Sequence, residues 1–395
     1  MLISNIKSFL VCPYSSMKLA EMDKHWLRKH WVLVKVETDE GIVGWGEAYT
    51  QPTRERSIAQ LADTIGAYII GKSPFHIKHF THIAYNDLSG RRGSMDIFCA
   101  VSAIEQALWD IVGKKLGTPV YNLLGGPCRD KIRVYANGWY RSLTDTDDLV
   151  RRAKETVQAG FTALKFDPFP GPWRSIISKE DEDIAVRNVG LVREAVGQDV
   201  DVLVEVHRRL APMYATRIAR RMEQFNPFWY EEPVPADNIH ALAEVRHDIN
   251  LPVVTGETLY TKAAFREVLE RQAADILNPD VANCGGILEL KEIAAMAEPY
   301  YVSISPHNYN STTMALAATI HASAVMTNFL ITEYFVQFAA TGNAISVNPI
   351  KVENGYIALP TAPGLGLEIN EEALKDYQFQ NFPPSNIRSY GDEWP

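Results

Sequence analysis

Three glutamates at a regular interval constrain the fold of this chain more than any other feature. Glu205, Glu231 and Glu257 are 26 residues apart at both steps, and each lies at or just beyond the end of a short apolar run. Apolar runs bounded by turn residues are typical of buried strands. A strand, a helix and a return within about 25 residues form one βα unit, and repeats of this unit close into a (β/α)₈ barrel.

The segment between the first two glutamates shows the helical period most clearly. Pro212 suits the first turn of a helix, and an apolar stripe follows at Met213, Ile218, Met222 and Phe225. The alternation of strands and helices therefore predicts an α/β fold, a (β/α)₈ barrel whose strand ends meet on one face.

Carboxylates at successive strand ends of such a barrel are expected to converge. The three glutamates offer only oxygen ligands, with no Cys among them and no His at an equivalent strand end. Oxygen ligands suit a hard cation that keeps open positions for substrate, and Mg²⁺ fits best. A single glutamate more often caps a helix or pairs with an arginine. Repetition in register favours a metal site at Glu205, Glu231 and Glu257.

Composition limits the partners and the location. The chain has 395 residues, which leaves room for a barrel and a second domain of about 100 to 150 residues. A net charge of −9 and the lack of any basic run argue against nucleic acid as a partner. The four cysteines are far apart, the N-terminus lacks a signal-like segment, and no apolar run reaches membrane-spanning length. We expect a cytoplasmic protein that binds no membrane.

Residues 1–130 are predicted to form the first domain. Three strands of an antiparallel meander are expected in it, at residues 1–12, 31–37 and 44–48. The polar connection 13–30 is long for a meander, so we interpret it as a lid in which His25 and Arg28 bind substrate; a disordered excursion is the alternative.

Residues 57–117 have a helical pattern, and their apolar stripe is expected to be core. His76, His79 and His82 recur at helical spacing without a carboxylate or cysteine partner. We expect a solvated or packed helix face there.

Residues 131–354 are predicted to form the barrel, and the tail from about 355 to 395 is expected to return to the first domain. The strands expected besides those before the three glutamates are at 132–136, 163–167, 275–277, 301–305 and 329–331.

Further polar residues fall at the predicted strand ends. Alternation along a strand puts Lys165 and Asp167 on one face and links Glu205 to His207. The same rule lets only one of the adjacent pair Glu231 and Glu232 face inward, and spacing does not say which.

The series of strand-end residues continues beyond the third glutamate. Asp280, His307 and Glu333 follow Glu257 at intervals of 23, 27 and 26 residues. In barrel enzymes, catalytic residues come from the carboxyl ends of several strands.

With these residues assembled, the chain resembles the enolase superfamily, mandelate racemase subgroup, over nearly its whole length. The motifs that carry the resemblance are GWGE at 44–47, AIEQALWD at 103–110, LLGG at 123–126, EEP at 231–233, GE at 256–257 and NPD at 278–280. The resemblance implies an α+β capping domain on a modified (β/α)₈ barrel, one essential Mg²⁺, a homo-oligomer, and removal of a proton alpha to a carboxylate.

Within that family, the segments YANGWY at 135–140 and KFDPF at 165–169 are similar to gluconate and galactonate dehydratases. A His two residues after the first metal ligand, here His207, also matches those acid-sugar enzymes. The chain departs from the family pattern at Glu205, where Asp is usual, and at Asp167, where racemases carry a second Lys.

The expected roles follow from this likeness and from the chemistry of the residues. His307 is assigned as the base that removes the proton, with Asp280 orienting its imidazole. His207 is assigned as the acid that protonates the departing hydroxyl; a contact to a substrate hydroxyl is its alternative.

Three further residues complete the expected site. Lys165 is an alternative base, an electrostatic aid to the carboxylate, or a proton carrier, and the sequence does not choose among these roles. Glu333 is expected to donate a hydrogen bond to the bound carboxylate, or to polarise it, opposite the metal. Asp167 is assigned to substrate binding, with His25 and Arg28.

The leading functional hypothesis is a lyase that dehydrates a small sugar acid, an aldonate, to its 2-keto-3-deoxy acid. The alternative is an isomerase of the same superfamily, either an epimerase that uses Lys165 and His307 or a cycloisomerase that acts on a lactone or anhydro-sugar acid. A third hypothesis is a sugar-acid binder without activity, which an intact ligand set disfavours.

Overall fold

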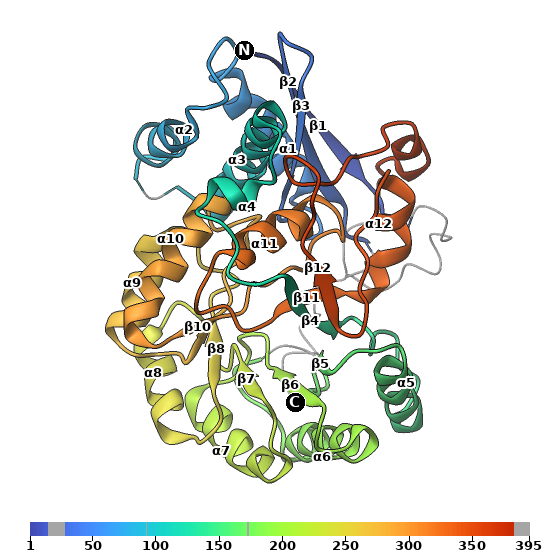
Figure 1. Ribbon diagram of the computed structural model, residues 1–395. Helices are drawn as coiled ribbons and strands as arrows, with labels where there is room; N and C mark the ends of the chain where they lie inside the picture. The colour runs from blue at the N-terminus through green and yellow to red at the C-terminus, as the bar shows by residue number, and fades with distance from the viewer. Residues whose placement is uncertain (15–27, 92, 172–173, 383–395) are drawn as a thin grey trace.

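The computed structural model describes residues 1–14, 28–91, 93–171 and 174–382. A three-stranded antiparallel sheet stands above a barrel of parallel strands, and the long helix α3 lies between them (Figure 1). The elements of the first part are β1 Ile3–Val11, β2 Trp31–Thr38, β3 Val43–Ala48, α1 Glu55–Ala67, α2 Ile77–Ile83, a π turn at Ala84–Leu88, α3 Met95–Leu116 and α4 Val120–Leu123. The predicted antiparallel meander is confirmed, in the order β1-β2-β3.

Parallel strands alternate with helices over the rest of the chain. The elements are β4 Lys131–Asn137, α5 Thr146–Gln158, β5 Ala163–Phe166, α6 Lys179–Val196, β6 Asp201–Glu205, α7 Pro212–Met222, β7 Trp229–Glu231, α8 Ile239–Asp248, β8 Val253–Thr255, α9 Thr261–Glu270, β9 Ile276–Leu277, α10 Ile287–Ala297, β10 Ser303–Ile304, α11 Met314–Ala324, β11 Thr332–Phe335, α12 Ala339–Ile345 and β12 Tyr356–Ala358.

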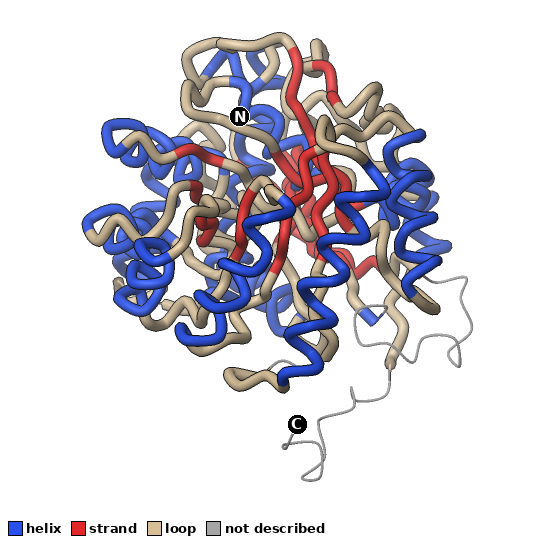
Figure 2. Tube along the Cα trace, turned by 90° about the horizontal axis from the view of Figure 1, so that it is seen from below, coloured by secondary structure: helices blue, strands red, loops and turns tan. Residues whose placement is uncertain are grey.

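The strands close on themselves. The order runs from β10 through β9, β8, β7, β6, β5 and β4 to β11, and Phe329, just ahead of β11, forms a parallel bridge with Ile304 of β10. Seen from below, the strands lie in the middle with helices around them (Figure 2). The predicted (β/α)₈ barrel is confirmed.

The interior of the barrel has two layers, because alternate residues of a strand face the same side. The lower layer is apolar and takes one residue from each of seven neighbouring strand segments: Tyr135, Ala163, Leu203, Trp229, Val254, Ile276 and Ile331. Two residues after six of these seven come the polar side chains Asn137, Lys165, Glu205, Glu231, Asn278 and Glu333. The apolar layer is therefore the floor on which the polar layer rests.

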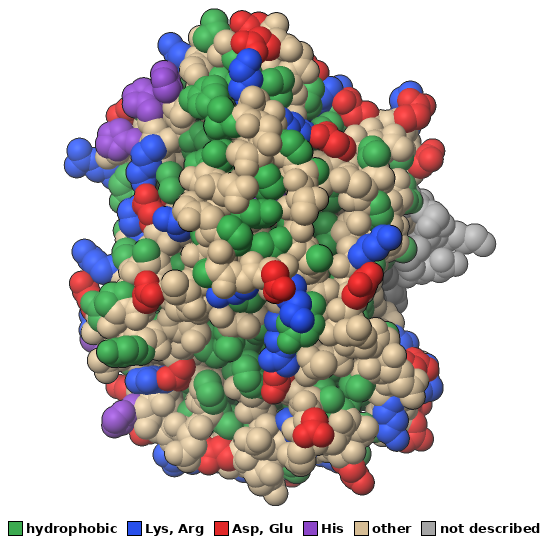
Figure 3. Space-filling view, in the orientation of Figure 1, with side chains coloured by type: hydrophobic (Ala, Val, Ile, Leu, Met, Phe, Trp, Pro, Cys, Tyr) green, Lys and Arg blue, Asp and Glu red, His purple; other side chains and the backbone are tan. Residues whose placement is uncertain are grey.

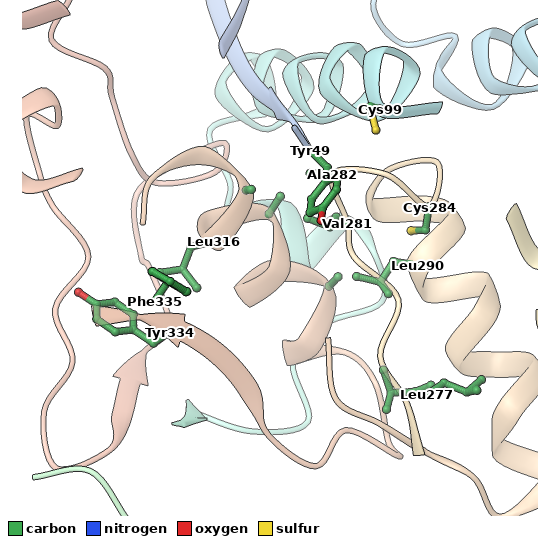
Figure 4. Close-up of a cluster of buried hydrophobic side chains, with 14 of the residues drawn as sticks. Tyr49, Cys99, Leu277, Val281, Ala282, Cys284, Leu290, Leu316, Tyr334 and Phe335 are labelled. Carbon is green, nitrogen blue, oxygen red and sulfur yellow. The ribbon is translucent and has the colours of Figure 1, made fainter. Parts of the chain in front are cut away.

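Helix α3 joins the sheet to the barrel through buried polar side chains. The Gln106 amide accepts a hydrogen bond from the Glu47 backbone N–H (3.1 Å) and donates to the Glu47 carbonyl (3.0 Å). A Cβ on Gly46 would lie 1.9 Å from the Ala103 carbonyl oxygen, so only glycine fits where β3 crosses α3. This close packing brings Tyr49, directly after β3, beside Val281 and Ala282 of the barrel (Figure 4).

The tail contacts both parts of the molecule. β12 pairs antiparallel with β4 of the barrel, Gly364 bridges Pro119, and Gln378 bridges Val11 of β1. The tail therefore pairs first with the barrel and then reaches the first sheet.

Two local expectations are wrong. The eighth strand is β11 at Thr332–Phe335 rather than 329–331, so Glu333 lies within the strand and not after it. The apolar run was misleading because Phe329 pairs with β10, whereas β11 pairs with β4. Met213 is not on the buried stripe of α7: its side chain is 63% exposed, since the buried positions are Ala215, Ile218, Ala219 and Met222.

The histidine row lies where its pattern predicts. His76, His79 and His82 are exposed along α2, and Figure 3 shows purple histidine side chains gathered over that helix. Among the helices of the described residues, none combines the length and the apolar composition that a bilayer crossing needs.

Candidate active site

Three carboxylates meet at the upper ends of neighbouring barrel strands. Glu205 ends β6, Glu231 ends β7, and Glu257 follows β8; one oxygen from each lies within 4.8 Å of the others. Their relative exposures are 1%, 0% and 5%. The constant spacing in the sequence thus corresponds to convergence in space. Glu231, and not Glu232, is the inward residue of the adjacent pair, because Glu232 accepts hydrogen bonds from Thr255 and Gly256 of the neighbouring strand.

The donor set fits a hard cation. Within the described residues, Glu205 Oε2 and Glu231 Oε2 are buried and accept no hydrogen bond. A buried carboxylate oxygen without a donor is unfavourable unless a cation or ligand satisfies it. An all-oxygen set of this kind suits a divalent ion such as Mg²⁺ and lacks the nitrogen and sulfur ligands typical of zinc. The three glutamates could therefore hold a metal ion.

Lys165 lies in the middle of the polar layer. Its Nζ is 2.8 Å from Glu231 Oε1, 3.3 Å from Glu205 Oε2 and 3.4 Å from Glu333 Oε1. Burial lowers the pKa of Lys165, but Glu231 and Glu333 outweigh that effect and raise it well above its ordinary value. Lys165 therefore adds positive charge to a crowded acidic layer.

The acidic residues differ in their electrostatics. Burial and then the neighbouring Glu205 raise the pKa of Glu231 well above its usual range. Burial also raises the pKa of Glu257, but Arg208, His307, Lys165 and His207 outweigh it and hold that pKa below its usual range. Arg208 donates a hydrogen bond to Glu257 Oε1. A bound cation would lower the pKa of every carboxyl in this cluster.

A histidine–aspartate pair stands on one side of the glutamates. His307 Nδ1 lies 2.7 Å from Asp280 Oδ2, and Asn310 donates to both Asp280 oxygens at 2.9 Å. His307 Nε2 lies 3.5 Å from Glu257 Oε2 and 3.5 Å from Glu333 Oε2. Burial lowers the pKa of His307, but Glu257, Glu333 and Asp280 raise it to about 9. The sequence placed this pair on neighbouring strand ends, and the structure brings it into contact.

A second pair stands beside the first glutamate of the series. His207 Nδ1 lies 2.8 Å from Asp167 Oδ2, and the His207 backbone N–H donates to Glu205 Oε1 at 2.7 Å. His207 and Arg208 have positive φ angles of 56° and 59°. This left-handed stretch turns the chain sharply after β6, so that the His207 ring is held close to the carboxylate cluster.

Several residues of the site were not predicted. Asn278 Nδ2 donates to Glu231 Oε1 (2.9 Å), and Asn137 donates to Glu333, whose other oxygen accepts from the Asn308 backbone N–H at 2.8 Å. Period two along β4 and the NPD motif carried the signal for Asn137 and Asn278, because both are inward positions at strand ends.

The first domain also reaches the site. The Tyr49 ring lies 5.9 Å from the His307 ring, and fully buried Lys29 donates through Nζ to the Tyr309 carbonyl. Burial lowers the pKa of Lys29 to about 7 against the opposing effects of Glu47 and Asp280. Lys29 belongs to the connection 13–30 that the sequence indicated as a lid, whereas long-range contacts bring Tyr49 to this place.

Of the two predicted lid residues, one lies among the described residues. His25 lies outside the described residues. Arg28 is half-buried and directly precedes Lys29 in the chain. A substrate-binding role for either residue stays a prediction.

Taken as chemistry, the site combines a cation-binding carboxylate set with two imidazoles, each on its own aspartate. Comparison with known families agrees with that combination. Residues 148–373 match the model described as enolase C-terminal domain-like, and residues 12–125 match the N-terminal domain of mandelate racemase and muconate lactonizing enzymes. The chain belongs to this enolase superfamily group.

Relatives within the superfamily include named dehydratases. A D-gluconate/D-galactonate dehydratase of Picrophilus torridus is 34% identical, over 87% of this chain and 87% of that protein. A D-gluconate dehydratase of Thermoproteus tenax is 33% identical, over 93% of this chain and 73% of that protein. The solved structure of a mandelate racemase/muconate lactonizing enzyme-like protein from Roseovarius has a TM-score of 0.88 at 32% identity, with 98% of each chain covered.

Proposed function

We propose that this protein is a Mg²⁺-dependent acid-sugar dehydratase, a hydro-lyase that converts an aldonate of the gluconate or galactonate type to its 2-keto-3-deoxy acid. The observation that carries the proposal is the pair of separate histidine–aspartate contacts, 2.7 Å and 2.8 Å, flanking one carboxylate cluster. Dehydration needs one group to take a proton and another to give one. The names of the relatives support the same reaction class.

Glu205, Glu231 and Glu257 would hold the cation. When bound there, Mg²⁺ supplies positive charge that binds the substrate carboxylate and stabilises the negative charge that builds up on its oxygens. Asn278 and Lys165 fix Glu231 from the protein side, through contacts of 2.9 Å and 2.8 Å to the same oxygen, Oε1. Its other oxygen, Oε2, is the one without a hydrogen bond among the described residues.

His307 is the proposed base. It takes the proton from C2 of the aldonate, and Asp280 accepts a hydrogen bond from Nδ1, which leaves Nε2 as the atom that receives the proton. Glu333, held by Asn137 and the Asn308 backbone, stands 3.5 Å from Nε2 on the same side. We assign it to contact with the substrate carboxylate.

His207 is the proposed acid. The bond from C3 to its hydroxyl oxygen breaks as His207 gives that oxygen a proton, so the hydroxyl leaves as water. The electron pair freed by loss of the C2 proton forms the C2–C3 double bond. The resulting enol takes up a proton at C3, loses the proton of its C2 hydroxyl, and so becomes the 2-keto acid. Hydroxide is a poor leaving group, so this step depends on the acid.

A cytoplasmic location and a homo-oligomeric state complete the proposal. The location rests on the cysteines: Cys12, Cys99, Cys128 and Cys284 are all unpaired, as is usual in a reducing compartment. The oligomeric state rests on the family resemblance. Sedimentation of the purified protein would test it directly.

The reaction itself is tested with a panel of acid sugars in two readouts. Five- and six-carbon aldonates should give a new ketone, and in deuterated water His207→Asn should still exchange the C2 hydrogen without eliminating, whereas His307→Asn should do neither. Conversion of a lactone or anhydro-sugar acid to an isomer of unchanged mass, with no ketone from any aldonate, would contradict dehydration and favour a cycloisomerase. Exchange that persists in His307→Asn would instead move the base to Lys165.

A further inference from the structure

We propose that Asp167 is a positioning residue for the acid step and not a ligand of the substrate: it fixes the imidazole of His207 so that Nε2 is the atom that delivers the proton. This inference rests on the proposed dehydration and deepens it. It replaces the substrate-binding role that the sequence alone suggested for Asp167.

The backbone places Asp167 and His207 side by side. β5 and β6 are parallel neighbours, with Phe166 paired to Val204, so the residues just beyond both strands emerge side by side. Asp167 directly follows β5, and His207 comes two residues after the end of β6. The sharp left-handed turn at His207 then keeps its ring beside the strand end, where Asp167 Oδ2 meets Nδ1 at 2.8 Å.

Both oxygens of Asp167 accept hydrogen bonds from the protein. Oδ1 accepts from the Phe169 backbone N–H at 3.0 Å, and Oδ2 is shared between His207 and Arg209. A carboxylate with this many protein donors has little capacity left for substrate hydroxyls.

Arg209 supports this arrangement from the buried side. Its Nε donates to the Val206 carbonyl at 2.7 Å, and its guanidinium lies 5.1 Å from the centre of the Phe169 ring. The side-chain exposures are 3% for Arg209, 13% for Asp167 and 19% for His207. Exposure to solvent therefore increases along this hydrogen-bonded chain, from the interior at Arg209 to the open site at His207. A buried cation thus holds the carboxylate, and the carboxylate holds the imidazole.

The hydrogen bond at Nδ1 of His207 determines which ring nitrogen can transfer a proton. A carboxylate can only accept, so it selects the form of His207 with a proton on Nδ1, and proton transfer must then use Nε2. Asparagine in its place can donate its amide N–H to Nδ1 and select the opposite tautomer. A structural role alone predicts no such change in tautomer.

The test uses a leaving group that needs no proton. From a 3-deoxy-3-fluoro-aldonate, loss of the C2 proton to His307 and cleavage of the C3–F bond release fluoride as an anion, and the same 2-keto-3-deoxy acid results. Asp167→Asn should lower kcat for the aldonate by about 10²- to 10⁴-fold with little change in KM, yet release fluoride at nearly the wild-type rate. His207→Asn should give the same pattern, and the double variant should be no slower than His207→Asn alone.

The matched control is Asp201→Asn, which removes an aspartate at the opposite end of β6, paired with Arg133 at 2.8 Å. It should leave both reactions unchanged. Equal losses of dehydration and fluoride release in Asp167→Asn would overturn the inference while leaving the proposed function intact.

A measurement without substrate tests the positioning role of Asp167 separately from the proposed dehydration. In a ¹⁵N-edited spectrum of histidine-labelled full-length protein, the His207 signal, identified by its absence in His207→Asn, should show a protonated Nδ1 in the wild type and an unprotonated Nδ1 in Asp167→Asn. Should the wild type convert no aldonate, the proposed function fails and the acid role falls with it. An Nδ1 that is unprotonated in the wild type overturns the positioning role whatever the activity.

Discussion

Two groups of buried carboxylates in this molecule have different hydrogen-bonding surroundings. Glu47, Glu105 and Asp110, the seam carboxylates, lie where α3 and β3 meet the barrel; Glu205, Glu231 and Glu257, the mouth carboxylates, lie at the strand ends. Both sets are almost fully removed from water. Charge and burial therefore do not distinguish them.

The hydrogen bonds do distinguish them. Glu47 accepts from the backbone N–H groups of Ser311 (2.7 Å) and Ala315 (3.0 Å), at the start of α11. Glu105 accepts from those of Ile287 (2.7 Å) and Leu288 (3.0 Å), at the start of α10. Such a carboxylate satisfies otherwise unpaired helix N–H groups and is stabilised by the helix dipole.

Asp110 completes the seam set. It accepts from the backbone N–H groups of Trp45 (3.0 Å) and Leu365 (2.8 Å), which joins the sheet to the tail. Every seam oxygen thus has a hydrogen-bond donor. Among the described residues, Glu231 Oε2 accepts no hydrogen bond, and Glu205 Oε2 has only the ion pair with Lys165 at 3.3 Å. The contrast teaches that a buried carboxylate completed by the protein maintains structure, and one left incomplete is a candidate for binding.

The largest expected effect separates the two regions by activity. Glu231→Gln should lower turnover on the order of 10³-fold or more, because it removes a ligand charge. Its free energy of unfolding should stay the same or rise, since burial already disfavours that charge and raises the Glu231 pKa. Ketone formation and urea unfolding of the purified variant measure both quantities.

Glu105→Gln is the matched control for that prediction. Its amide N–H₂ would face backbone donors, so the free energy of unfolding should fall by about 2 to 3 kcal/mol while turnover per folded molecule is kept. Parallel losses of stability and activity in both variants would mean that the two regions do not differ in kind.

The next effect concerns the cation itself. Adding Mg²⁺ at about 100 times its Kd should raise the free energy of unfolding of the wild type by about 2.7 kcal/mol, because a ligand of the native state stabilises it by mass action. Glu105→Gln should keep that increase and Glu231→Gln should lose it. Unfolding curves with Mg²⁺ and with a chelator give the comparison, and an undiminished increase in Glu231→Gln would place the ion elsewhere.

The smallest expected effect concerns the buried, neutral imidazole of His321, where α4 meets α11. His321 Nδ1 accepts from the Tyr121 backbone N–H at 3.1 Å, and burial lowers the His321 pKa to about 4. In the unfolded chain the histidine pKa is about 6.5. Between about pH 6.5 and about pH 4 the unfolded state therefore binds more protons than the folded state, so the free energy of unfolding falls as the pH drops through this range.

The size of that effect follows from the two pKa values. Between about pH 7.5 and about pH 5 the wild type should lose about 2 kcal/mol more than His321→Asn, which keeps an acceptor without the titration. Urea unfolding at both pH values measures the difference. The same pH dependence in both proteins would show that His321 does not control it.

The sequence revealed the mouth region better than the seam. Repetition at 26 residues predicted that Glu205, Glu231 and Glu257 converge, because strand ends of a parallel barrel meet on one face. Alternation predicted the inward position of Lys165 in the same way. These are short-range rules applied to a repeating unit, so they carry over from strand to strand.

What the sequence could not give depends on distant contacts or on unusual backbone. Glu105 contacts residues more than 180 positions away in the chain, and nothing near it in the sequence indicates helix capping. The partner of Asp167 depends on the left-handed backbone at His207, which residue type does not predict. The predicted start of the eighth strand was three residues too early, because the apolar run at 329–331 begins with Phe329, which pairs with β10, whereas β11 pairs with β4.

The apolar floor of seven side chains beneath the polar layer determines the route by which substrate and products enter and leave the site. A barrel filled in this way is closed at its lower end by packed side chains, so the site opens at the upper ends of the strands. Under the proposed reaction, the aldonate, the released water and the keto acid all use that opening. Bound product blocks the next substrate. The residues around this opening therefore affect the rate of product release as well as which sugar acid is accepted.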